Sequence, residues 1–206
     1  EITLDQAYER AWTTWNLDHT AEATSQVAKY ISDFFILSGR YAHFAVDLLQ
    51  LVLKITAKIY GNNSLELSDP LDSLADLYKG QGNFKSSEQA HRKALEISEQ
   101  LRGPNHRNTA MHINNLAVVL LDQGYLHEAE KMYRLALAIT TKANGDQHYE
   151  TGTCLNNLAL ALSEQGNLEA AEPMYRRALA ISEQALGPDH PSTGTSLNNL
   201  ALLLSN

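Results

Sequence analysis

The sequence has little of what stabilises a secreted protein or anchors a membrane protein. It contains one cysteine, five prolines and 7% aromatic residues, and it has no long uninterrupted apolar run. Cys154 has no second cysteine to pair with, so an intramolecular disulfide is excluded and a reducing, cytoplasmic location is predicted. The most apolar stretch, around residues 34–53, is interrupted by Ser, Gly, Arg, His and Asp, which excludes a membrane-spanning helix or signal peptide there.

Positive charge is also scarce. Sixteen basic residues stand against 24 acidic ones, a formal net charge of -8. This is the wrong sign for a protein that wraps nucleic acid or binds an anionic membrane, so neither is expected as a partner. The residues that are abundant, Ala, Leu, Asn, Glu and Gln, combine with the few prolines and aromatics to favour an all-α fold.

Four apolar anchors recur at a constant interval of 42 residues: Leu71, Ile113, Leu155 and Leu197. They open the segments LDSLADLY, INNLAVVL, LNNLALAL and LNNLALLL. Each complete copy then passes through a Gly turn into a second segment, such as YRLALAIT or YRRALAIS. Two helical segments joined by a glycine turn, repeated at a fixed period, predict a stack of antiparallel helical hairpins.

The period also divides the chain. Short residues such as Ala117, Ala159, Ala136 and Ala178 recur within the repeats and predict close approach of the paired helices. Because the chain starts without Met and stops inside a repeated segment, we expect a piece of a longer protein. The predicted parts are an N-terminal helix and connector (1–24), a degenerate hairpin repeat (25–70), repeats at 71–112, 113–154 and 155–196, and the first helix of a truncated repeat (197–206).

The segment LGPDHPSTGTSLNNLALLL resembles the 42-residue tetratricopeptide repeat of kinesin light chains and of many bacterial signalling proteins. The resemblance covers residues 64–206 clearly and residues 25–63 in degenerate form. It implies a right-handed α-solenoid of antiparallel hairpins, with a concave groove where the second Asn of each repeat contacts peptide backbones. Kinesin light chains favour tryptophan-containing peptides with acidic flanks, which they bind through basic groove residues. This sequence departs from that pattern, because its first clear repeat is acidic and the long heptad coiled coil is absent.

Metal binding and catalysis are not predicted. His106, His148 and His190 are again 42 residues apart, so they would lie on successive layers about 10 Å apart, whereas zinc needs every ligand within about 2.3 Å. We expect them to cap the linkers. The other five histidines show no paired ligand spacing, and Cys154 has no catalytic partner in the sequence. Phosphate-binding, nucleophile-elbow and dinucleotide motifs are absent, so we predict no cofactor and no enzyme activity.

The first helices provide the candidate site. At 100° per residue their core side leaves an opposite side that combines paired Asn with apolar residues. Amide side chains both donate and accept hydrogen bonds, so this side could hold the backbone of an extended peptide. The alternative is that these residues merely cap turns or face water. The predicted peptide-binding residues here are Asn114, Asn115, Val118, Asn156, Asn157, Leu160, Asn198 and Asn199.

Asp69, Asp72 and Asp76 share one helix face in the first clear repeat. We include them in the predicted site as an acidic end that selects Lys or Arg in the ligand; an ordinary solvated face is the alternative.

The predicted function is a non-catalytic scaffold that binds a peptide or partner-protein segment in the groove. The alternative is a regulatory or self-assembly module of a larger signalling protein. Weak end-to-end association is expected through residues 197–206, where no second helix covers Leu197, Leu200, Ala201 and Leu204.

Overall fold

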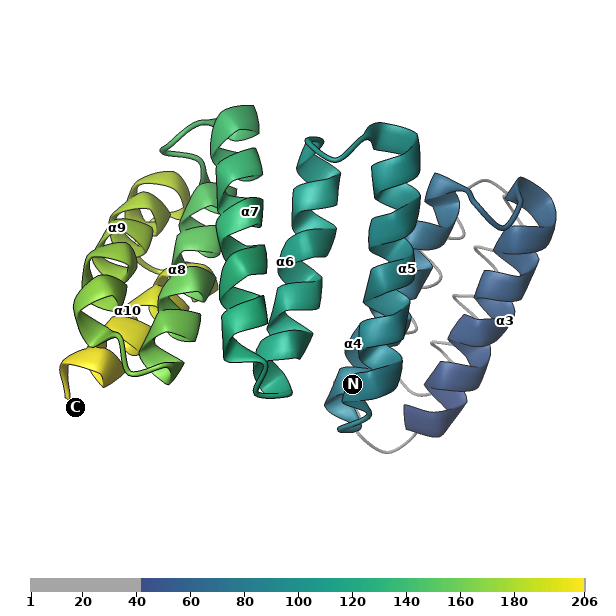
Figure 1. Ribbon diagram of the computed structural model, residues 1–206, viewed down its shortest axis with the longest axis horizontal. Helices are drawn as coiled ribbons and strands as arrows, with labels where there is room; N and C mark the ends of the chain where they lie inside the picture. Colours follow the sequence, from purple (N-terminus) through teal and green to yellow (C-terminus); the bar gives the residue numbers. More distant parts are fainter. Residues whose placement is uncertain (1–41, 206) are drawn as a thin grey trace. The chain divides into compact units, whose positions relative to one another are not determined.

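The computed structural model describes residues 42–205, in which helices are the only regular secondary structure (Figure 1). The all-α prediction is confirmed. The predicted helix within 1–24 and the first part of the degenerate repeat, residues 25–41, lie outside the described residues. The chain divides into two compact units, residues 1–101 and 102–206. The described part of the first unit contains α3 (Ala42–Tyr60), the short 3-10 helix η1 (Leu65–Leu67), α4 (Ser68–Gly80) and nearly all of α5 (Phe84–Arg102). The second unit contains α6 (Arg107–Asp122), α7 (Leu126–Asn144), α8 (Tyr149–Glu164), α9 (Leu168–Leu186) and α10 (Pro191–Leu204).

The first unit is built on the apolar stripe of α3. Ala45, Leu49 and Val52 are buried and pack with Leu74 and Leu77 of α4. The described part of the predicted degenerate repeat therefore contains a helix, α3, that packs on α4. The turn from α4 to α5 contains Gly82, which has a φ of 73°. Glycine adopts this left-handed conformation with little steric strain.

The second unit holds two complete hairpins, α6 with α7 and α8 with α9, and α10 packs against α9 and α8. Gly124 and Gly166 make the two hairpin turns, as predicted, each with a φ of 81°. The helices α6 and α8 begin one to two turns before the anchors Ile113 and Leu155, so each anchor marks the middle of a first helix.

Short side chains let the paired helices approach closely, as the sequence predicts. Ala136 and Ala178 on the second helices are completely buried, and so are Ala117 and Ala159 on the first. Leu155 of α8 packs with Ala178 and with neighbouring apolar side chains of α7 and α9. Small residues at these positions therefore allow the paired helices to pack closely.

The linkers carry a repeated cap. His148 accepts a hydrogen bond from the Glu150 amide through Nδ1, and His106 and His190 do the same one repeat earlier and later. The prediction that these histidines cap the linkers is confirmed. A second contact was not foreseen: the buried Thr151 hydroxyl donates to the Gly145 carbonyl at 2.8 Å, and its repeat equivalents Thr109 and Thr193 make the same bond. These contacts fix where each first helix begins.

Candidate functional site

The three first helices of the second unit, α6, α8 and α10, are neighbours, and they carry most of the predicted binding residues. We call the surface they share the first-helix face. A pocket of about 230 Å³ lies between α6 and α8. Its lining residues are Arg107, Ala110, Met111, Asn114, Asn115, Thr140, Tyr149, Glu150, Thr153 and Cys154.

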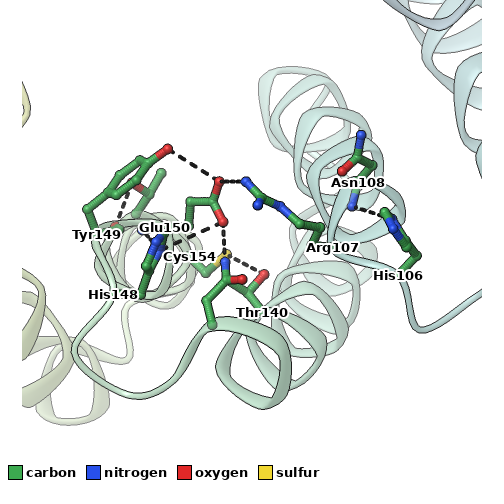
Figure 2. Close-up of polar contacts among 10 residues, drawn as sticks. His106, Arg107, Asn108, Thr140, His148, Tyr149, Glu150 and Cys154 are labelled. Atoms are coloured by element: carbon green, nitrogen blue, oxygen red, sulfur yellow. Dashed lines mark hydrogen bonds and ion pairs between the residues drawn. The ribbon is translucent and has the colours of Figure 1, made fainter.

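One side of the pocket is a polar network centred on Glu150 (Figure 2). Its carboxylate accepts a hydrogen bond from the Arg107 guanidinium at 3.3 Å, one from the Tyr149 hydroxyl at 3.3 Å and one from the Asn144 amide. The network joins α6 to the start of α8. Glu150 is only partly exposed, and its carboxylate accepts hydrogen bonds from three donors. Arg107 is largely exposed, and it has N–H groups beyond the one bound to Glu150 that a ligand can reach.

Cys154 lies on the pocket wall toward α7, where its thiol donates to the Thr140 hydroxyl at 3.7 Å (Figure 2). Only 5% of the residue is exposed, and burial raises the pKa of the thiol above its usual value. A raised pKa keeps the group as a thiol near neutral pH, which makes it a poor nucleophile. The structure therefore gives Cys154 a packing role in the pocket wall.

Two asparagine pairs connect successive first helices. Asn157 of α8 donates to the Asn114 carbonyl of α6 at 3.1 Å, and Asn199 of α10 donates to Asn156 of α8 at 3.2 Å. In each pair, one amide that the sequence predicts to bind a peptide therefore already donates an N–H group to the other. Asn115 lines the pocket and makes no side-chain hydrogen bond within the described part of the chain.

The placement of the other predicted residues on this face is mixed. Asn156 was expected to face outward, but only 8% of it is exposed, because the neighbouring first helix covers it and Asn199 bonds to it. Asn198 is exposed, and Val118 and Leu160 are half-buried at equivalent positions of α6 and α8. The face therefore combines amides that range from buried to exposed with a row of half-buried apolar side chains.

The three predicted acidic residues lie on α4 in the first unit, and they differ in exposure and in their partners. Asp69 and Asp76 are exposed. Asp72 instead meets the buried His91 of α5, with 2.9 Å between His91 Nδ1 and an Asp72 carboxylate oxygen. Asp72 is thus part of the hairpin contact rather than of an open surface. Although Asp76 is open to solvent on one side, neighbouring atoms still desolvate its carboxyl group and raise its pKa; nearby His91 partly opposes this shift and Asp72 adds to it.

Across residues 42–205, no cluster of three or more His, Cys, Asp or Glu side chains has the arrangement of a metal site. The same residues include no helix that is both long and apolar enough to cross a membrane. His91 and His112 are buried within the hairpins, and His127 is exposed on α7.

The hydrogen bond from Asn157 to Asn114 predicts that the Asn157 amide contributes to stability. Replacing Asn157 with Ala should lower the free energy of unfolding by about 0.5–1.5 kcal/mol, because a partly buried hydrogen bond between two helices is lost. Asn115→Ala is the matched control and should stay within about 0.5 kcal/mol of the parent. Urea denaturation of the single variants and of Asn114→Ala/Asn157→Ala measures the coupling. Strictly additive losses in the double variant would show that the two amides do not stabilise each other.

Comparison with protein families identifies the tetratricopeptide repeat in four overlapping matches, at residues 24–100, 73–124, 108–184 and 164–205. Together these matches cover nearly the whole chain after its first 23 residues, including the first-helix face. A search of curated proteins finds no match.

Solved structures share the fold. The structure of BtubC (BKLC) from P. vanneervenii is similar with a TM-score of 0.81 at 22% identity, covering 98% of this chain and 81% of that one. A kinesin light chain-type protein with nearly identical TPR-like repeats from Podosopora anserina gives 0.70 at 21% identity, covering 89% of this chain and 85% of that one. The apo form of RapI gives 0.70 at 15% identity, covering 98% of this chain and 54% of that one. At such identities the likeness establishes the helical-hairpin solenoid fold.

Proposed function

The chain belongs to the tetratricopeptide repeat family, and from this we propose that it is a non-catalytic scaffold whose first-helix face binds an extended segment of a partner protein. The observation that carries the proposal is the pocket between α6 and α8. It places Asn114 and Asn115, both selected from the sequence, beside large apolar side chains that are open to solvent.

The size and lining of the pocket favour a peptide side chain as its occupant. Its volume of about 230 Å³ lies below the range of roughly 300–1,000 Å³ typical of small-molecule sites. Met111 and Tyr149 line it and are nearly half exposed, so an inserted apolar side chain would remove apolar surface from water. We therefore expect a ligand with one bulky apolar residue at this point.

Polar groups around the pocket suit the backbone on either side of that residue. Asn115 has both its donors and its acceptor available within the described part of the chain, and Arg107 has N–H groups beyond the one bound to Glu150. Contacts of this kind recognise peptide groups irrespective of sequence. The apolar residue would then supply the specificity.

The acidic residues of α4 add a second element to the proposal. Asp69 and Asp76 remain exposed on the first unit, and the chain carries a net charge of -8. Negative charge speeds association with positively charged ligands, an effect that salt screens. Lys- or Arg-containing peptides are therefore the proposed preference. A cytoplasmic location stays part of the proposal because a lone cysteine suits a reducing compartment.

The test is selection from a displayed library of random linear peptides, followed by affinity measurement on two matched variants. Thr153→Trp places a large ring in the pocket, and it should weaken binding of the selected peptides by at least about tenfold. Thr195→Trp changes the equivalent exposed residue of α10, outside the pocket, and should leave affinity nearly unchanged. Both hydroxyls make the same bond, to the carbonyl four residues earlier, so the local loss is equal in the two variants. Peptides that bind Thr153→Trp as tightly as they bind the parent would place the binding site outside the pocket between α6 and α8.

A further inference from the structure

The two asparagine pairs of the first-helix face leave more hydrogen-bond donors than acceptors for a ligand. Each pair of amide side chains carries four N–H groups and two carbonyl oxygens. One N–H of Asn157 is bound to the Asn114 carbonyl, and one N–H of Asn199 is bound to the Asn156 carbonyl. Within the described part of the chain, three N–H groups and one unbonded carbonyl therefore remain in each pair. This surplus of donors favours a ligand whose backbone presents carbonyl groups.

The spacing of the pairs favours one backbone conformation of the ligand. The pairs occupy equivalent repeat positions, so a segment that lies across α6, α8 and α10 meets one pair per layer. Helices in contact lie about 8–10 Å apart. A β-strand returns to the same orientation after two residues, which is about 6.7 Å. A polyproline II helix returns to it after three residues, which is about 9.3 Å, and it therefore matches the spacing of the layers.

Tyr149 gives the pocket an aromatic wall that is held in place before a ligand binds. Its ring lies beside the His148 ring, with 4.7 Å between the centroids and 35° between the planes, and its hydroxyl donates to Glu150 at 3.3 Å (Figure 2). The His148 ring is itself fixed, because its Nδ1 accepts the Glu150 amide. Tyr149 is nevertheless 44% exposed, so its ring is open to a ligand. Grooves lined by aromatic rings are the usual docking sites of polyproline II segments.

Proline in the ligand satisfies both requirements of this face. It has no backbone N–H, so a proline-rich segment presents carbonyl acceptors to the surplus of amide donors. Proline also fixes φ near the polyproline II value, so such a segment loses little conformational freedom when it binds. The hydrogen-bond surplus and the layer spacing thus point to the same class of ligand.

We infer that the partner segment is a proline-rich chain in the polyproline II conformation, which lies across α6, α8 and α10 with one turn of three residues per layer. The inference rests on the proposed function, and it adds the conformation and the chemical class of the ligand. One apolar residue of the segment enters the pocket, and every third residue along the segment faces the protein in the same way. Carbonyl groups of the segment accept hydrogen bonds from Asn114 and, one layer further, from Asn156.

Fluorescence anisotropy with three labelled peptides tests the inference on the full chain. The probe consists of four Leu-Pro-Pro triplets. A peptide of the same composition, with its leucines in two adjacent pairs, keeps the polyproline II conformation but loses the three-residue period. A peptide of four Leu-Gly-Gly triplets keeps the period but lacks the fixed φ. Each control should bind at least about tenfold more weakly than the probe. The inference is overturned if either control binds as tightly as the probe, or if the probe does not bind at millimolar concentration.

A matched pair of protein variants tests the donor role of the amides. Asn114→Asp removes both N–H groups but keeps an oxygen that accepts from Asn157, so urea denaturation should show a stability close to that of the parent. This variant should bind the probe about tenfold more weakly. Gln184→Glu makes the same chemical change at an exposed position of α9 and should bind the probe like the parent. Equal affinity of Asn114→Asp and the parent would show that Asn114 donates nothing to the ligand and would overturn the inference.

Two further outcomes separate this inference from the proposed function. Library peptides that lose affinity for Thr153→Trp but contain no proline would support the proposed function and overturn the polyproline II inference. A Leu-Pro-Pro probe that binds Thr153→Trp as tightly as it binds the parent would contradict both, because the segment would then lie outside the pocket between α6 and α8.

Discussion

Replacing Leu155 with Ala should lower the free energy of unfolding by about 2–4 kcal/mol, the largest effect we expect from a single truncation in this chain. Leu155 is 3% exposed and packs with Ala178 and Ile181 of α9. Truncation removes three methyl or methine carbons from this contact and leaves a cavity, since paired helices relax only partly around it. Urea denaturation followed by circular dichroism measures the loss.

Leu197→Ala makes the same chemical change at the same repeat position, where the side chain is 56% exposed. At a protein concentration low enough to keep the chain monomeric, its effect should stay within about 0.5 kcal/mol of zero. The difference between the two variants isolates the contribution of coverage by a second helix. Equal losses would mean that Leu155 stabilises the chain through its own helix and not through packing.

The second large effect is expected at Gly152, where α8 comes close to α9. A Cβ atom added at this position would lie 3.1 Å from Ile181 Cγ2 and 3.3 Å from Ile181 Cβ, which is tighter than ordinary van der Waals contact. Gly152→Val adds two further methyl groups there, so the helices must separate or Ile181 must leave its preferred position. We expect the free energy of unfolding to fall by about 1–3 kcal/mol.

The matched control is Gly194→Val, one repeat later in α10. An added Cβ atom at Gly194 meets nothing within 4 Å. Valine also has a slightly better helix propensity than glycine, so this variant should be neutral or gain a few tenths of a kcal/mol, about 0.4 at most. Thermal and urea denaturation of the pair provide the comparison. A Gly152→Val protein with the same free energy of unfolding as the parent would show that α8 and α9 can shift apart without loss of stability.

Part of the candidate site was predictable from the sequence. The 42-residue period and the helical angle select Asn114 and Asn115, and both line the pocket. The Arg107–Glu150 pair was missed, although a signal for it exists. Its members are 43 residues apart, the same separation that joins Asn114 to Asn157, so residue n of one first helix meets residue n+43 of the next.

Two predicted residues turned inward, and the reason is the same for both. A helical projection uses only the angular positions of residues on one helix. It therefore identifies the side that faces the core and assigns all other residues to the solvent. Asn156 is nevertheless covered by the neighbouring first helix, and Asp72 is held by buried His91 of the paired helix. Both contacts depend on how far one helix is shifted along another, which the projection does not contain.

The sequence by itself determined those features of the fold that depend on local spacing along the chain. The hairpin turn at Gly166, the linker cap of His148 and the small residue Ala178 at the helix contact all follow from the repeat, because helix geometry converts sequence distance into position. Only the tertiary structure decided which equivalent positions are covered. Asn114 and Asn156 occupy the same repeat position, yet Asn114 is half-buried and lines the pocket whereas Asn156 is only 8% exposed, since burial is set by the neighbouring helices and not by the residue's own helix.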